Sequence, residues 1–182
     1  DIHKESKLSG KIHDKSVNII RGLVSNIINS YEDIPVDFYL NFEQSYGVID
    51  GDSASVAEVL CILSALTKKP IKQNISITGS INQLGEVQAI GGVNEKIEGF
   101  FKVCKFIDDY KGKGVLIPSS NKDELILMPE VEKAIEDGDF HIYTMDTLND
   151  AIETLILKEN ETIEEFYFIL KEEIKKYRSK KE

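Results

Sequence analysis

Residues 50–67, DGDSASVAEVLCILSALT, contain the stretch that decides the fold, because a turn rich in glycine and aspartate leads directly into a long apolar segment. The apolar residues from Val56 to Leu66 follow one another with little interruption, which is typical of a largely buried helix. Ser53 stands at the junction and is expected at or near the N-terminus of this helix. From its position alone, Ser53 is either a helix cap or a nucleophile.

Strands and helices alternate on the C-terminal side of this segment. QNISITGS (73–80), GEVQAI (85–90), GVLIP (114–118) and HIYT (141–144) are predicted strands. Helices are predicted at 93–110, 129–137, 147–157 and 161–177, the last of them amphipathic. In the first of these helices one apolar face is expected to hold Val93, Ile97, Phe100, Val103, Cys104 and Ile107.

The N-terminal side is predicted to hold one helix between two strands. A short strand is expected around Leu8 to Ile12, and VDFYLNF (36–42) alternates apolar and polar residues as a half-buried strand does. The apolar residues of the intervening helix, which Pro35 ends, are Val17, Ile20, Leu23, Val24, Ile27 and Ile28. These elements together predict one mixed α+β domain.

Composition excludes several classes of function. A net charge of -10 with a pI near 4.9 argues against a nucleic-acid surface, which needs a concentrated basic face. The chain has no glycine-rich phosphate loop and no apolar run that could span a bilayer, so we expect a soluble, cytoplasmic piece without its own nucleotide site. Cys61 and Cys104 lie in apolar helical runs without metal-ligand spacing, which predicts two buried core residues and no metal site.

A serine nucleophile needs a base, and Lys96 is the better candidate in this chain. Lys96 follows GGVNE at the first turn of an apolar helix, where burial and the positive end of the helix dipole disfavour an ammonium ion. In isolation, a lysine there is more often simply exposed. His3 and His141 lie outside any triad motif, and for His13 a catalytic, a capping and a purely structural role stay open.

The string FEQSYGVIDGDSASVAE, followed by ITGSINQLGEVQAIGGVNEKIEGFF, resembles the proteolytic domain of Lon-type ATP-dependent proteases, and within them the Lon-B branch of archaea and bacteria. In that family the nucleophilic serine lies in a (D/E)-G-x-S-A-(G/S) motif and the catalytic lysine in a later G-G-x-x-x-K motif. These motifs match Ser53 and Lys96, which are 43 positions apart. The resemblance implies a Lon proteolytic domain over 1–182, with a core at about 8–157, a C-terminal amphipathic helix at 158–182 and a fold like ribosomal-protein domain 2.

Three supporting residues follow from the same resemblance. Asp50 matches an acidic residue that contacts the lysine in some members, Thr78 a threonine near the lysine amine, and Asp52 the acidic neighbour of the serine in the Lon-B branch. A charged Asp50 beside Lys96 would hold the lysine protonated. We therefore interpret an Asp50–Lys96 ion pair as the mark of an inactive state.

The resemblance also implies a function and partners. These are cleavage of unfolded or damaged proteins by a Ser–Lys dyad, a homo-hexameric ring, and an AAA+ module of the same polypeptide that binds ATP and Mg. The chain begins with Asp1, so we expect that module in a longer protein, with a membrane anchor there if the source is archaeal. The alternatives are a catalytically silent ring-assembly module and an enzyme that acts on small amides.

Overall fold

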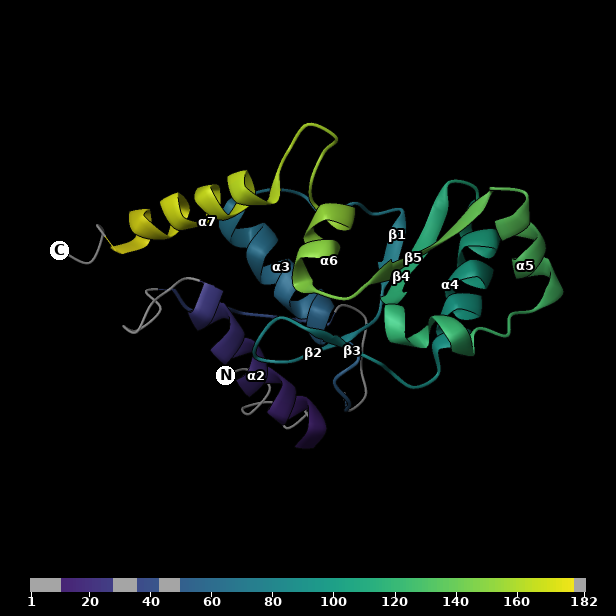
Figure 1. Cartoon of the computed structure of the whole chain (residues 1–182), viewed down its shortest axis with the longest axis horizontal. Coiled ribbons are helices and arrows are strands. Elements are labelled where there is room, and N and C mark those ends of the chain that lie inside the picture. The colour runs from purple at the N-terminus through teal and green to yellow at the C-terminus, as the bar shows by residue number, and fades with distance from the viewer. Residues whose placement is uncertain (1–10, 28–35, 43–49, 179–182) are drawn as a thin grey trace.

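The computed structural model describes residues 11–27, 36–42 and 50–178, with side chains from 16–27, 36–42 and 50–177. Helices and strands alternate along most of this part of the chain (Figure 1). In chain order the elements are α2 (Lys11–Ile27), α3 (Ser55–Thr67), β1 (Ile75–Ile77), β2 (Ser80–Ile81), β3 (Val87–Gln88), α4 (Val93–Ile107), β4 (Lys113–Pro118), the 3-10 helix η1 (Ser119–Glu124), α5 (Pro129–Glu136), β5 (Phe140–Met145), α6 (Leu148–Leu155) and α7 (Ile163–Arg178). The α+β class predicted from the sequence is confirmed.

Three parallel strands form the central sheet in the order β1-β4-β5. Ile77 of β1 pairs with Leu116 of β4, which pairs in turn with Tyr143 of β5. Parallel neighbours need long crossover connections, and here β2, β3 and α4 form the first one while η1 and α5 form the second. Strands β2 and β3 make a separate antiparallel pair, with Ser80 opposite Gln88.

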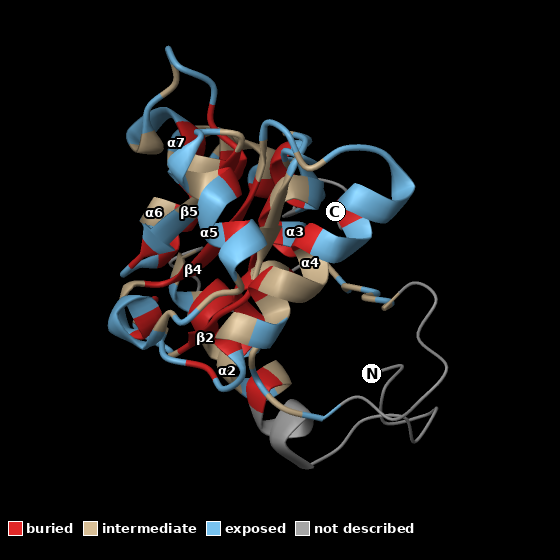
Figure 2. Cartoon of the chain, turned by 90° about the vertical axis from the view of Figure 1, so that its right-hand side faces the viewer, coloured by how far each residue is buried: buried red, intermediate tan, exposed pale blue. Residues whose placement is uncertain are grey.

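The sheet separates two hydrophobic cores, because side chains alternate along β4. Leu116 enters the first core, which α2, α3, α6 and α7 build. Val115 and Ile117 enter the second core against α4 and α5, where Ile97 and Phe101 are fully buried. Figure 1 shows α3 and α6 on one side of the strands and α4 and α5 on the other, and Figure 2 shows buried residues in the interior with exposed residues around them.

The C-terminal helix α7 packs on α3 and belongs to the first core. Phe166, Leu170 and Ile174 recur every four residues, which places them on one helical face, and all three are buried. The apolar face predicted for 161–177 therefore covers the helix that follows Ser53.

Two predictions for the N-terminal part need correction. Lys11 and Ile12 lie in α2, so the strand predicted around Leu8 to Ile12 is wrong there, and its residues 8–10 lie outside the described part. Residues 36–42 alternate in exposure as predicted but form no strand. Phe38 and Leu40 pack against the first core. Alternation reports which side chains face a core, and it does not report whether a partner strand binds the backbone.

Two helix faces also differ from the prediction. Along α4 the buried stripe is Val93, Ile97, Phe101 and Cys104, whereas Val103 and Ile107 are exposed. Spacings of four, four and three residues keep this stripe on the sheet as the helix turns about 100° per residue, and they turn Val103 outward. Cys104 is buried as predicted. Cys61 is exposed, because the narrow solvent-facing side of α3 holds Cys61 and Ala65.

Candidate active site

Ser53 lies in the turn that precedes α3, two residues before the first residue of the helix. Ala54 rather than Ser53 occupies the N-cap position, and no side chain caps the helix there. The cap alternative that the sequence left open therefore does not describe Ser53 in this structure. The serine is half-buried, so its hydroxyl is neither sealed in the core nor fully surrounded by solvent.

The main chain of Ser53 is clamped to the segment that follows β1. The Gly79 N–H donates to the Ser53 carbonyl at 2.8 Å, and the Val56 N–H donates to the Gly79 carbonyl at 3.2 Å. This close approach favours a glycine, since a Cβ on Gly79 would lie 2.6 Å from the Met145 Cε and 3.0 Å from the Val56 Cγ2, and both side chains would have to shift. The serine backbone is thus fixed by the edge of the sheet.

Two further serines fix the turn around Ser53. The Ser55 hydroxyl donates to the Asp52 carbonyl at 2.7 Å and accepts from the Ile81 N–H at 3.1 Å. The Ser80 hydroxyl donates to the Asp52 carboxylate, from Oγ to Oδ2, at 2.9 Å. Ser55 and Ser80 are both buried, whereas Asp52 is exposed. Side-chain hydrogen bonds therefore order both the backbone and the carboxylate of residue 52.

Lys96 extends from the first turn of α4. Gly92 precedes this helix in the left-handed region, with φ 69°, and its carbonyl accepts from the Lys96 N–H at 3.1 Å. The Lys96 Nζ lies 3.4 Å from the Thr78 Oγ1 and donates to it. Burial lowers the pKa of Lys96 from its ordinary value, and the nearby Asp52 carboxylate partly opposes that shift.

Thr78 connects the serine and the lysine. Its hydroxyl accepts from the Lys96 Nζ and donates to the Ser53 carbonyl at 3.3 Å, and its side chain is buried. The structure thus brings together four of the five predicted site residues, namely Ser53, Lys96, Thr78 and Asp52.

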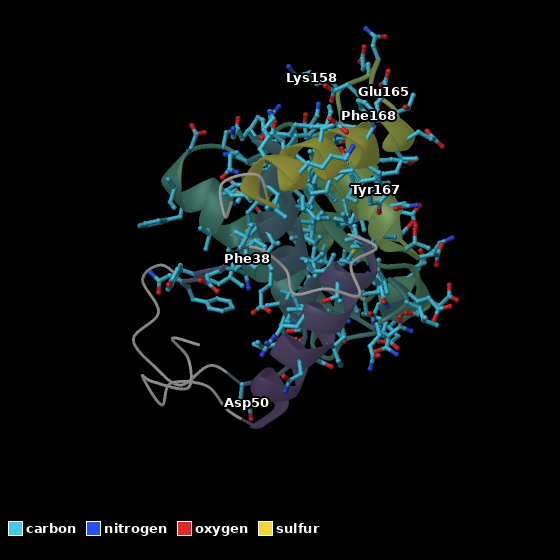
Figure 3. All side chains as sticks on the ribbon, turned by 90° about the vertical axis from the view of Figure 1, so that its left-hand side faces the viewer. Phe38, Asp50, Lys158, Glu165, Tyr167 and Phe168 are labelled. Carbon is cyan, nitrogen blue, oxygen red and sulfur yellow. The ribbon has the colours of Figure 1, made fainter. Side chains whose placement is uncertain are left out.

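Asp50 is the fifth predicted residue and is exposed. Its Oδ1 accepts from the Gly51 N–H at 2.9 Å, and Figure 3 shows the side chain at the lower edge of the molecule. The carboxylate that raises the pKa of Lys96 here is that of Asp52. The Asp50–Lys96 ion pair that we interpreted as an inactive state stays a prediction.

Of the three histidines in the sequence, only His141 has a side chain within the described part of the chain. His141 is half-buried on β5, where its ring lies 6.0 Å from that of Tyr143. His13 lies in α2, and its side chain is outside the described part. His3 lies outside the described residues altogether. Within the described residues, no group of three histidine, cysteine or acidic side chains could hold a metal ion.

Sequence reasoning missed Ser55 and Ser80, the residues that order Asp52. A signal did exist, because both lie inside the quoted motif strings, in DGDSAS and in ITGS. Buried polar side chains must find partners, so short serines beside an apolar helix and a strand point to a local hydrogen-bond network. Their partners could be identified only once the strand and the turn were placed together.

Comparisons with known proteins match most of this chain. The family model described as the Lon protease (S16) C-terminal proteolytic domain matches residues 18–158. A Lon protease homolog of Escherichia coli (strain K12) is 42% identical over 156 residues, covering 86% of this chain and 27% of the relative. The Archaeal Lon protease of Methanocaldococcus jannaschii is 46% identical over 100 residues, covering 50% of this chain and 15% of the relative. The chain thus spans about a quarter or less of the length of these relatives.

Proposed function

Because this chain belongs to the Lon protease (S16) family of C-terminal proteolytic domains, we propose that it cleaves peptide bonds with Ser53 as nucleophile and Lys96 as general base. One observation carries this proposal. The Thr78 hydroxyl accepts from the Lys96 Nζ and donates to the Ser53 carbonyl, which ties the base to the nucleophile residue. Dyad chemistry needs such proximity between a serine and an amine.

The proposed reaction is acyl transfer in two steps. Neutral Lys96 takes the proton of the Ser53 hydroxyl while Oγ attacks the scissile carbonyl carbon. The tetrahedral intermediate then collapses, the leaving amine takes the proton from the Lys96 ammonium group, and an acyl-serine ester remains. Lys96 next takes a proton from water, whose oxygen attacks the ester, and returns a proton to the Ser53 oxygen as the acid product leaves.

The mechanism requires a neutral Lys96, and burial works in that direction. A lysine that keeps its ordinary pKa near 10.4 is almost wholly protonated at neutral pH and cannot accept the serine proton. The Asp52 carboxylate works in the opposite direction, so the competence of the base depends on how that carboxylate is held.

Backbone N–H groups beside Ser53 would stabilise the oxyanion. We assign this role to the amides of Ser53 and Ala54, because the amides of Ser55 and Val56 already donate to the carbonyls of Asp52 and Gly79. Both amides lie just ahead of the N-terminus of α3, where the positive end of the helix dipole also favours a developing negative charge.

For the whole protein we propose an ATP-dependent protease of unfolded or damaged proteins. An AAA+ module of the same polypeptide would bind ATP and Mg, and six copies would form a ring that encloses the sites. We keep the cytoplasm as the expected compartment, with a membrane anchor outside this chain if the source is archaeal. Among the described residues, no helix has the length and apolar character to cross a bilayer.

The test is hydrolysis of a fluorogenic peptide and of casein by the 182-residue chain and by its Ser53→Ala variant. We expect Ser53→Ala to abolish cleavage at retained folding. Ser64→Ala is the matched control, because it also removes a serine hydroxyl from the α3 segment, one that donates to the Lys69 carbonyl away from the site. Cleavage that survives in Ser53→Ala would refute the proposed nucleophile, and a folded but inactive parent chain would favour the silent ring-assembly module.

A further inference from the structure

A buried serine controls the carboxylate beside the proposed nucleophile. Ser80 is 3% exposed and its hydroxyl donates to the Asp52 Oδ2 at 2.9 Å. Asp52 is exposed, and this hydrogen bond holds its carboxylate in its present position. The donor itself is fixed, since β2 pairs Ser80 with Gln88 and the next amide, that of Ile81, donates to the Ser55 Oγ.

The position of the Asp52 carboxylate matters because its field reaches Lys96. Burial lowers the pKa of Lys96, and Asp52 is the carboxylate that opposes this effect. In the described part of the chain no ion pair joins the two residues, and each has another hydrogen-bond partner, Ser80 for Asp52 and Thr78 for Lys96. The lysine is thus influenced by the carboxylate without being paired with it.

The other charged side chains near Lys96 are held elsewhere. On α4, the Glu98 carboxylate accepts from the Met128 N–H at 2.9 Å, and Glu95 is exposed and folded back toward Gly92. On η1, which packs against α4, the Glu124 carboxylate accepts from Asn121 at 3.1 Å. On β4, Lys113 pairs with Asp108 at the far end of α4. Asp52 is the carboxylate whose charge acts on Lys96 in this structure, so a change in its position changes the pKa of the lysine.

We propose that Ser80 is a positioning residue that keeps the Asp52 carboxylate from pairing with Lys96 and so keeps the lysine available as a base. This inference rests on the proposed function of Ser53 and Lys96. When the Ser80 hydroxyl is removed, Asp52 turns toward Lys96, the ion pair forms, and the lysine holds its proton to higher pH. Ser80 acts through Asp52 and touches neither the substrate nor the reacting atoms.

The experiment is the pH–rate profile of peptide cleavage by the full 182-residue chain and four variants: Ser80→Ala, Asp52→Asn, Ser80→Ala with Asp52→Asn, and the control Ser64→Ala. We expect Ser80→Ala to shift the rising limb about one pH unit upward and to lose about tenfold in rate at neutral pH, because one pKa unit is a tenfold change in the neutral fraction. In the Asp52→Asn background the same change should shift nothing, because no charge remains to pair with Lys96.

Each outcome bears on one of the two claims. If Ser53→Ala is inactive but Ser80→Ala keeps the parental pH profile, the role of Ser80 is wrong and the dyad stands. An equal alkaline shift in the Asp52→Asn background would also refute that role, because the effect would not pass through the carboxylate. If Ser53→Ala stays active, the dyad itself fails. Titration of a ¹³C-labelled Lys96 by NMR in the Ser53→Ala background decides the Ser80 claim without turnover, since Ser80→Ala must raise the lysine pKa.

Discussion

The two hydrophobic cores lie on opposite faces of one sheet, and each anchors the helix that carries or follows one residue of the proposed dyad. Ser53 precedes α3, whose Val56 and Leu63 are fully buried in the first core. Lys96 lies on α4 next to Ile97, which is fully buried in the second core. The two halves meet at the end of β1, where the Thr78 hydroxyl binds both. Neither core alone can form the site.

The two halves are also held by different kinds of bonds. The Ser53 backbone is fixed by hydrogen bonds to Gly79 and Thr78, which do not depend on pH. The Lys96 amine is held by burial and by one hydrogen bond of 3.4 Å, and the Asp52 charge acts on it. The difference indicates that the main chain of the proposed nucleophile is held rigidly, whereas the pKa of the proposed base can be tuned by neighbouring charge.

The largest expected effect comes from weakening the second core. Phe101 is fully buried, with its ring 5.2 Å from that of Phe140 and 4.6 Å from that of Tyr110. Phe101→Ala should cost about 3–5 kcal/mol of unfolding free energy, measured by urea denaturation. Hydrogen exchange should show greater loss of protection in α4 and α5 than in α3. Equal loss in both cores would contradict the separation of the two cores by the sheet.

In the first core, replacing Glu58 is expected to raise the unfolding free energy at alkaline pH, by less than Phe101→Ala lowers it. Burial raises the pKa of Glu58 from 4.5 to about 7. The folded state therefore binds this proton more tightly than the unfolded state, and the stabilisation present below pH 4.5 is lost as the pH rises to about 7. The loss is on the order of 3 kcal/mol.

Glu58→Gln removes this titration. The unfolding free energy of the variant should therefore equal that of the parent near pH 4.5, the unfolded-state pKa, and should exceed it at about pH 8. Urea denaturation at the two pH values measures the difference. Glu153→Gln, an exposed position on α6, is the control. A variant that is less stable than the parent at the higher pH would overturn this account of the first core.

A weaker effect is expected from a substitution at Thr78, where the two cores meet. Thr78→Val keeps the shape of the side chain but removes the hydroxyl that binds Lys96 and the Ser53 carbonyl. We expect about a tenfold fall in kcat, in line with the net worth of one hydrogen bond, and little change in KM. Steady-state kinetics on the fluorogenic peptide give both constants. A rise in KM at unchanged kcat would place Thr78 in substrate binding instead.

The smallest effect is expected at Asp50, the acidic residue at the edge of the site. If an Asp50–Lys96 ion pair marks an inactive state, Asp50→Asn should raise activity at neutral pH by a few-fold at most, because the side chain is exposed and screened. A pH–rate profile of the folded variant measures this. No gain at neutral pH would remove Asp50 from the regulation of Lys96.

Much of this arrangement could be predicted from the sequence. A nearly continuous apolar run indicated the helix that became α3, and apolar periodicity indicated α4 and α6, because such patterns depend on local geometry alone. Resemblance to the Lon family indicated Ser53, Lys96, Thr78 and Asp52. The exposure of Val103 and Cys61 was missed, because a helix pattern does not specify how far the covering elements extend.

The hydrogen bonds of Ser80 and Ser55 could not be predicted either. The bond from Ser80 to Asp52 spans 28 positions and the bond from Ile81 to Ser55 spans 26, and both form through the close approach of Gly79 to α3. Such contacts depend on three-dimensional packing, and no period or spacing in one sequence encodes them. The non-strand conformation of residues 36–42 has the same cause, because strand pairing also depends on distant partners.

The measurement that tests the dyad most directly is the rate at which a fluorophosphonate labels Ser53 as a function of pH. We predict labelling of Ser53 alone, with a rate that rises through an apparent pKa below the ordinary lysine value of about 10.4. In Lys96→Met, which keeps an unbranched side chain of similar length but removes the amine, labelling should be at least about a hundredfold slower. Labelling that is equally fast without Lys96, or that occurs at another serine, would contradict the account.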